Sequence, residues 1–210
     1  MIRVFIADDH ALIREGLRTL LLDEQDIKII GEANSGLDVV AEIERLRPDI
    51  AILDITLPGR SGLDLLKDIA RFEPRIPVLF LTMHPERRYA LRAFRSGAAG
   101  YLTKESAPDE LVRAIRKIIG GGRYVTPKFS EHLTFDLQAP AERPPHETLS
   151  DREFQVLLGI ATGRPTKDVA AELSVSEATV YTYRERLLKK MGLKSSTEFT
   201  RYCLEHGLIE

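Results

Sequence analysis

Four short runs of apolar residues recur along the first half of the chain, and each leads into one or two polar residues. The runs span residues 2–7, 50–53, 78–81 and 99–102, and they lead into Asp8-Asp9, Asp54, Thr82 and Thr103-Lys104. Near-continuous apolar strands are typical of a parallel sheet that is covered by helices on both faces. The pattern therefore predicts a parallel sheet whose strands deliver polar groups at their carboxyl ends.

Segments with helical periodicity separate these runs. In residues 11–22, Leu17 and Leu21 fall on one side of a helix, while Arg14 and Arg18 fall on the other. A further strand is expected over residues 27–33, and further helices over about 39–46, 63–69, 89–94 and 107–119. Strand and helix alternate five times, which predicts a doubly wound α/β domain with a five-stranded parallel sheet over residues 1–122.

The pattern changes after residue 122. Residues 123–147 hold four prolines among scattered polar residues, so we expect a linker there. From residue 148 to 210 only helical signals remain, beginning with a capping box at Ser150 and Glu153. Further helices are expected over Thr166–Leu173, Glu177–Met191 and about 196–206. The second domain is therefore predicted to be a small all-α module of four helices.

Composition narrows the class of protein. The chain has 210 residues, 43% apolar and 30% charged, which suits two small globular domains. A net charge of −2 gives the whole molecule no general attraction to nucleic acid. One cysteine, Cys203, makes a disulfide framework or a zinc site implausible and fits a reducing compartment. No run is long enough to span a membrane and no signal peptide is evident, so a cytoplasmic protein is expected.

The strand ends carry a set of groups that suits phosphoryl transfer. Carboxylates such as Asp9 and Asp54 are suitable ligands for Mg²⁺, and the backbone carbonyl of Thr56 offers a third. A carboxylate can also attack phosphorus, which would make Asp54 an acyl phosphate. Lys104 can neutralise charge on the transferring oxygens, and Thr82 can donate a hydrogen bond to one of them.

Each of these residues has an ordinary structural explanation when it is taken alone. A strand-end aspartate or threonine is usually a helix cap, and a single lysine is usually a surface charge. Their joint occurrence on four strand ends favours a functional site. Two histidines near the site, His10 and His84, show no metal-ligand spacing and are expected to be rim residues.

The first domain resembles the receiver domain of two-component response regulators. The matching segments are Asp8-Asp9, residues 54–59, Thr82 and residues 97–104, and the order of elements agrees over the whole domain. The resemblance implies that Asp54 accepts a phosphoryl group from a sensor histidine kinase. It implies Mg²⁺ on Asp9, Asp54 and the Thr56 carbonyl, with Asp8 helping through water. It also implies that Thr82 and Tyr101 form a switch pair that responds to phosphorylation.

Two positions depart from the receiver pattern. Met83 stands where many receivers have a small residue, and a longer side chain there is expected to crowd the phosphoryl site. Glu105 follows Lys104 where many receivers have proline, and a cis peptide bond is rare without proline.

The second domain carries the layout of a helix-turn-helix. A short helix over 166–173, a turn over 174–176 and a helix over 177–191 follow one another, with Ser176 as a good N-cap. Val180, Leu187 and Met191 share the face expected to point into the core, flanked by Tyr183 and Leu188. The opposite face, which suits base edges and phosphates, carries Thr182, Glu185, Arg186 and Lys189, with Tyr181 at its edge.

Charge supports this interface only locally. Residues 148–210 hold nine basic and nine acidic residues, but five of the basic ones lie between Arg184 and Lys194. Charge alone would favour a solvated helix face with a Glu185–Lys189 ion pair. The helix-turn-helix order favours nucleic-acid binding instead.

The second domain resembles the LuxR-type output domain of the NarL/FixJ class. The match runs from Leu149 to Ile209, and the base-reading positions of that family fall on Tyr181, Thr182 and Glu185. The family commonly has lysine at the first of these and histidine at Tyr183, so a distinct sequence preference is expected. The resemblance also implies dimerisation near residues 196–202. The candidate DNA-binding residues are Thr179, Tyr181, Thr182, Tyr183, Arg184, Glu185, Arg186, Lys189 and Lys190.

The hypothesis that follows is a phosphorylation-dependent transcription regulator. Phosphoryl transfer to Asp54 would control dimerisation, exposure of the recognition helix, or both, on promoter half-sites of double-stranded DNA. The partners implied are the kinase, a second copy of the chain, DNA and RNA polymerase. Two alternatives stay open: a regulator that acts independently of phosphorylation, and an aspartyl-phosphate phosphatase. Adjacent Asp8 and Asp9, without a cap domain, disfavour the phosphatase, so no enzyme is expected beyond self-phosphorylation and slow autodephosphorylation.

Overall fold

The computed structural model describes residues 1–84, 86–126 and 144–209, with the backbone alone for residues 86–88. The chain divides into two compact units, Met1–Leu137 and Gln138–Glu210, and each is described by itself. Among the described residues, no helix combines the length and the apolar character that crossing a membrane requires.

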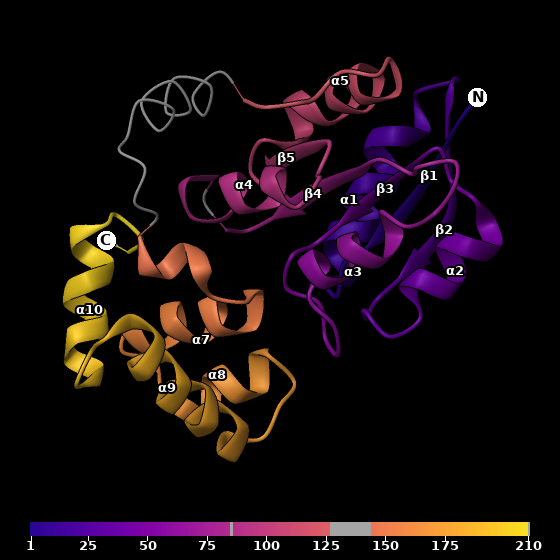
Figure 1. Cartoon of the computed structure of the whole chain (residues 1–210). Coiled ribbons are helices and arrows are strands. Elements are labelled where there is room, and N and C mark those ends of the chain that lie inside the picture. Colours follow the sequence, from indigo (N-terminus) through magenta and orange to yellow (C-terminus); the bar gives the residue numbers. More distant parts are fainter. Residues whose placement is uncertain (85, 127–143, 210) are drawn as a thin grey trace. The chain divides into compact units, whose positions relative to one another are not determined.

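The first unit is built on a five-stranded parallel sheet, in the order β2-β1-β3-β4-β5 (Figure 1). Its strands are β1 (Ile2–Ala7), β2 (Ile27–Ala33), β3 (Ile50–Leu53), β4 (Val78–Thr82) and β5 (Gly100–Thr103). The connecting helices are α1 (Ala11–Leu22), α2 (Val39–Leu46), α3 (Gly62–Ile69), α4 (Glu86–Arg95) and α5 (Ala107–Ile119). The expected doubly wound α/β domain is confirmed.

The apolar strands are buried because helices cover both faces of the sheet. On one face α1 and α5 pack against alternate strand residues such as Ile6, Ile52 and Leu81. On the other face, Phe5 and Phe80 lie against α2 and α3. Every residue of β3 and β4 is buried, which explains why these strands read as continuous apolar runs.

A glycine allows α3 to begin directly beneath the carboxyl end of β3. A Cβ atom on Gly62 would lie 2.2 Å from the backbone oxygen of Asp54 and 2.9 Å from the ring of Phe80. Ser61 caps this helix, since its side chain accepts a hydrogen bond from the Leu63 amide at 3.3 Å. The close approach holds the loop after β3 against the sheet.

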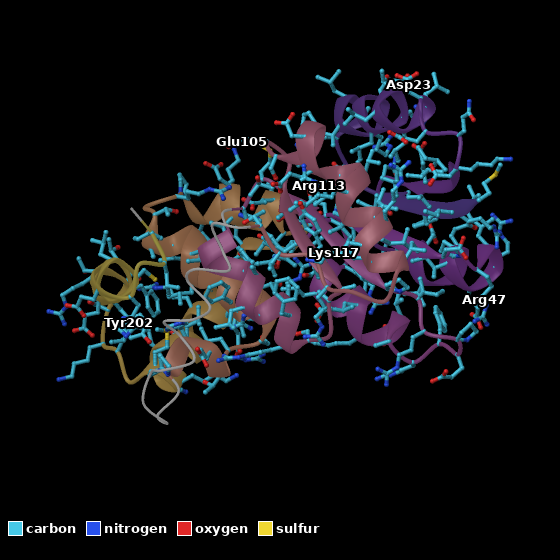
Figure 2. The ribbon with its side chains drawn as sticks, turned by 90° about the horizontal axis from the view of Figure 1, so that it is seen from above. Asp23, Arg47, Glu105, Arg113, Lys117 and Tyr202 are labelled. Carbon is cyan, nitrogen blue, oxygen red and sulfur yellow. The ribbon has the colours of Figure 1, made fainter. Side chains whose placement is uncertain are left out.

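The linker predicted over residues 123–147 lies mostly outside the described residues, but both of its ends are described. Tyr124 is buried and forms a parallel bridge with Gly100, donating from its amide to the Ala99 oxygen at 2.9 Å. Its ring lies 5.5 Å from the ammonium of Lys117, which Figure 2 labels on α5. Pro145–Thr148 forms a 3-10 helix, η1. Tyr124 thus belongs to the first unit and η1 to the second, rather than to a linker without regular structure.

The described residues of the second unit form helices joined by turns. After η1 come α7 (Asp151–Ala161), α8 (Thr166–Glu172), α9 (Glu177–Met191) and α10 (Ser196–Glu205) (Figure 1). The capping box is confirmed: the Ser150 side chain accepts from the Glu153 amide, and the Glu153 carboxylate accepts from the Ser150 amide at 2.8 Å. Helices α7 and α8 approach closely at Gly159, where a Cβ would lie 2.8 Å from Val169.

Candidate functional site

The strand register brings the polar strand ends of the first unit together. Ala7 pairs with Leu53, so Asp8 and Asp54 leave neighbouring strands side by side, and the Asp54 amide donates to the Ala7 oxygen at 2.8 Å. Thr82 pairs with Thr103 at the ends of β4 and β5. The carboxyl end of the sheet therefore gathers the two carboxylates, the hydroxyl and the ammonium, as the sequence predicted.

A buried lysine bridges two carboxylates at the centre of this site. The Lys104 ammonium lies 2.6 Å from Asp54 Oδ2 and 2.7 Å from Asp8 Oδ2. Burial alone disfavours the charged ammonium, but the two carboxylates outweigh it and raise the pKa of Lys104. The second Asp54 oxygen, Oδ1, accepts from the Thr56 amide at 3.1 Å. One ammonium faces two carboxylates, so the site keeps a net negative charge, and both oxygens of Asp54 are hydrogen-bonded.

The donor set at this edge fits a hard divalent cation. Side-chain atoms of Asp8, Asp9, His10 and Asp54 able to bind a metal lie within 4.8 Å of one another. The three carboxylates are the oxygen ligands that Mg²⁺ prefers, and Asp9 is partly open to solvent, as an ion that keeps waters requires. His10 is 60% exposed, as expected for a rim residue, and its Nδ1 lies 2.7 Å from Asp9 Oδ1.

A chain of hydrogen bonds links the loops that surround the site. The Thr56 hydroxyl bonds to His84 Nε2 at 2.8 Å, and the Tyr101 hydroxyl donates to the His84 carbonyl at 3.0 Å. The His84 amide donates to Thr82 Oγ1 at 3.4 Å. Tyr101 is buried, so its ring lies inward in this structure. His84, expected at the rim, instead joins the loop after β3 to the proposed switch pair.

The structure describes both positions at which the sequence departs from the receiver pattern, Met83 and Glu105. Met83 is 63% exposed, and the crowding of the phosphoryl site by its side chain stays a prediction. Among the described residues the one cis peptide bond joins Glu73 to Pro74, which leaves the bond before Glu105 trans.

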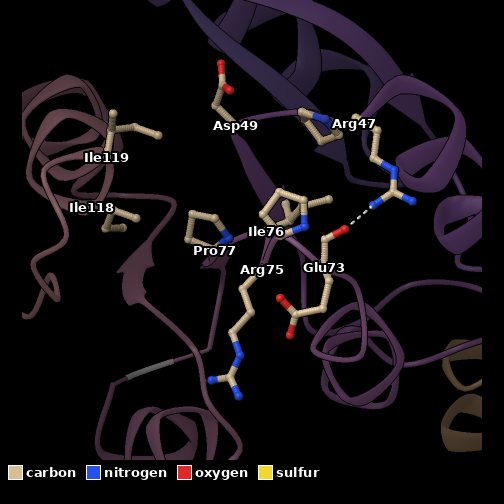
Figure 3. A pocket seen from close by; sticks show the side chains of 10 residues that line it. Arg47, Asp49, Glu73, Arg75, Ile76, Pro77, Ile118 and Ile119 are labelled. Carbon is tan, nitrogen blue, oxygen red and sulfur yellow. Dashed lines mark hydrogen bonds between the residues drawn. The ribbon is translucent and has the colours of Figure 1, made fainter.

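A pocket of about 570 Å³ opens at the opposite end of the sheet (Figure 3). It is lined by residues that precede β3 and β4 and by the last turn of α5, including Arg47, Ile76 and Ile119. Arg47 donates to the Glu73 carbonyl at 3.2 Å across it. The pocket lies at the amino-terminal ends of these strands, away from the carboxylates, and holds none of the predicted site residues.

In the second unit, α9 divides into the predicted faces. Val180, Leu187 and Met191 are buried. The residues expected to face outward are all exposed: Thr182, Glu185, Arg186 and Lys189, with Tyr181 at the edge. A pocket of about 340 Å³ runs along this side of the helix, lined by Ala178, Thr179, Thr182, Tyr183 and Arg186. The outward side of α9 is therefore exposed and polar, as expected of a helix that enters the major groove of DNA.

Two of the predicted DNA-binding residues hold the domain together. Arg184 Nε donates to the Ser196 hydroxyl on α10 at 2.8 Å. Lys190 lies 2.8 Å from the buried carboxylate of Glu153 on α7. Burial opposes the charged form of Glu153, but the bonds from Lys190 and from the cap outweigh it and lower the pKa of Glu153. In this structure both basic side chains have internal roles.

Helix α10 carries an aromatic cluster around Tyr202, which Figure 2 labels. The Tyr202 hydroxyl lies 2.9 Å from His146 Nδ1 on η1, and the ring of His206 stacks on the Tyr202 ring at 4.0 Å. Burial raises the pKa of the Tyr202 phenol. These contacts attach η1 to the helix on which dimerisation is predicted.

The two units define the class of protein: an α/β domain with an aspartate site at its strand ends, and a helix-turn-helix domain. Residues 4–116 match the response regulator receiver domain family, and residues 147–203 match the luxR family of bacterial regulatory proteins. The chain therefore belongs to the two-component response regulators of the NarL/FixJ class, which pair a receiver with a LuxR-type DNA-binding domain.

Similar proteins agree over the full length of the chain. Response regulator GacA of Pseudomonas protegens is 34% identical over 210 residues, covering 100% of this chain and 99% of its own. Response regulator UvrY of Escherichia coli K12 is 35% identical over 209 residues, covering 99% of this chain and 96% of its own. Both belong to the same class of response regulator.

Solved structures of response regulators share the fold of this chain. A LuxR-family response regulator from Aurantimonas sp. SI85-9A1 is 33% identical, has a TM-score of 0.62 and covers 66% of this chain and 99% of its own. RcsB from Salmonella enterica serovar Typhimurium, solved bound to promoter rprA, has a TM-score of 0.65 and covers 96% of this chain and 98% of its own. At 23% identity, RcsB shows the fold alone.

Proposed function

We propose that the chain is a phosphorylation-switched transcription regulator in which Asp54 accepts a phosphoryl group from a sensor histidine kinase. The observation that carries this proposal is the buried Lys104 ammonium between Asp54 and Asp8, at the edge of the sheet where β4 ends in Thr82. An ammonium in this position can neutralise a phosphoryl group that is attached to the neighbouring carboxylate.

The chemistry at Asp54 follows from its surroundings. A carboxylate oxygen of Asp54 forms the new bond to phosphorus, while the bond from phosphorus to the kinase imidazole nitrogen breaks and leaves its electrons on nitrogen. Lys104 and the Thr82 hydroxyl then bond to phosphoryl oxygens. Asp8, Asp9, Asp54 and the Thr56 carbonyl would hold Mg²⁺, which supplies positive charge against those oxygens when it is bound.

The hydrogen bonds around His84 suggest how the change spreads. Thr82 and Tyr101 both bond to His84, through its amide and its carbonyl. A Thr82 hydroxyl that turns toward a phosphoryl group must give up its bond to the His84 amide. Phosphorylation therefore changes the hydrogen bonds that hold the β4–α4 loop and Tyr101. This local change shifts the receiver between two conformations.

The output is binding to double-stranded DNA through α9. The exposed Thr182, Glu185, Arg186 and Lys189 suit base edges and phosphates, with Tyr181 at the edge. The second domain is formally neutral by sequence, so a single copy gains little from phosphate contacts. A homodimer on two half-sites gains by effective concentration, and α10 is the proposed contact between copies. We also propose that the protein acts in the cytoplasm and that RNA polymerase is a further partner.

The test is DNA binding with and without a phosphodonor. A duplex is first selected from random DNA with protein that has been incubated with acetyl phosphate and Mg²⁺. Wild type is expected to bind this duplex more tightly with acetyl phosphate than without it, while Asp54→Asn shows no response. Equal affinity of wild type in both conditions would contradict phosphorylation control and favour a regulator that acts without it.

A further inference from the structure

The carbonyl that joins the two adjacent aspartates has a partner on α1. Asp8 follows β1, and its amide donates to the Ala33 oxygen of β2 at 3.1 Å. Arg14 reaches back from the second turn of α1, and its Nη1 donates to the Asp8 carbonyl oxygen at 2.7 Å. That oxygen belongs to the peptide group between Asp8 and Asp9. We propose that Arg14 is a positioning residue that fixes this peptide group and, through it, the metal-binding carboxylates.

The guanidinium of Arg14 is itself held in place by charge. Its Nε lies 3.4 Å from Glu32 Oε2 on β2, and both side chains are mostly buried, at 17% and 18% exposed. Glu32 also accepts two bonds from Arg18, at 2.6 and 2.7 Å, and Arg18 pairs with Glu15 as well. Arg14 thus ties α1 and β2 to the end of β1.

A planar guanidinium is suited to this task. It presents donors in a fixed fork, so one arginine can serve a carbonyl and a carboxylate at the same time. A lysine offers a point charge that cannot meet both partners in the same geometry. Asp9 lies outside both the strand and the helix, so the peptide group before it helps to set the position of its carboxylate, together with the His10 Nδ1 contact at 2.7 Å.

An effect of the Arg14 charge and an effect of Arg14 on ligand position would change Mg²⁺ affinity in opposite directions. Arg14 adds positive charge near a site for a cation, so charge alone predicts that its removal strengthens Mg²⁺ binding. Positioning predicts that its removal weakens binding. Loss of a partner that orients a metal ligand typically costs about 10–100-fold in affinity. The sign of the change therefore separates the two explanations.

The experiment is calorimetric titration of Mg²⁺ into the full-length chain. Arg14→Met is expected to weaken Mg²⁺ affinity about tenfold. Arg14→Lys, which keeps the charge, is also expected to bind Mg²⁺ more weakly than wild type. Arg18→Met is the matched control, because it removes a charge from the same Glu32 network without touching the Asp8 carbonyl, and it is expected to stay near wild type.

Unchanged or tighter binding by Arg14→Met would overturn the proposal, and so would an equal loss in Arg18→Met. If Arg14→Met does not fold, Arg14→Lys decides in its place by the same criterion. The inference rests on the proposed function, but failure of that function would give a different experimental result. In that case the wild type itself would bind no Mg²⁺ or gain no phosphoryl group, whatever stands at position 14.

Discussion

Replacing Lys104 with methionine removes the one positive charge that we find between two buried carboxylates. The ammonium lies 2.6 Å from Asp54 and 2.7 Å from Asp8, and all three side chains are at most 4% exposed. Breaking a buried ion pair by removing one partner costs about 3–5 kcal/mol, because the remaining charge stays buried. At about 4 °C per kcal/mol for a domain of this size, the melting temperature of the receiver should fall by roughly 12–20 °C.

Mg²⁺ should recover much of this loss. With Lys104 gone, a divalent cation can neutralise the same carboxylates, and a ligand at one hundred times its Kd contributes about 2.7 kcal/mol. Wild type should gain less from Mg²⁺, since the ion must compete with the ammonium for Asp54 and Asp8.

The assay is differential scanning calorimetry of the full-length chain, once in EDTA and once in Mg²⁺. Lys67→Met is the matched control, because Lys67 forms an exposed pair with Asp64 at 3.2 Å. Such pairs contribute at most about 1 kcal/mol. If Lys104→Met melts at the wild-type temperature in EDTA, the reasoning about the buried charges is wrong.

Three further substitutions, one of them a control, test the packing beneath the site and the cap of the second domain. Gly62→Ala should cost about 1–3 kcal/mol in a denaturant titration, since its Cβ would lie 2.2 Å from the Asp54 oxygen. Gly16→Ala, with no atom within 4 Å of its Cβ, should stabilise α1 by about 0.5–1 kcal/mol, and a similar loss in both variants would contradict this. The lowered pKa of Glu153 stabilises the second domain above the unfolded-state pKa of about 4.3. Glu153→Gln should therefore be less stable than wild type at pH 7, and the difference should shrink as pH falls through the folded-state pKa; a constant difference would exclude the Lys190 pair as its cause.

The sequence predicted most of the fold and the centre of the site because both depend on local patterns. Strands buried on both faces must be apolar throughout, and helices must alternate with them, so short apolar runs between segments of helical period locate β1 and β3. The carboxyl ends of parallel strands meet at one edge of the sheet, so the positions of Asp54 and Lys104 after their strands are enough to place them together.

The residues that the sequence did not reveal depend on tertiary geometry. His84 bonds to Thr56 and Arg14 to the Asp8 carbonyl, and no spacing in the chain signals either contact. Tyr124 falls within the predicted linker because one bridging residue among glycines and prolines has no periodicity. A count of basic residues in α9 likewise could not show that Lys190 pairs with Glu153 inside the domain.

The central claim is that Asp54 is a phosphoacceptor, and intact mass tests it most directly. Wild type and Asp54→Asn are incubated with Mg²⁺ and acetyl phosphate, and their masses are measured without prior acid treatment. We expect wild type to gain one phosphoryl group and the variant to gain none. A gain of the same size in both proteins, or in neither of them even with a histidine kinase as donor, would contradict it.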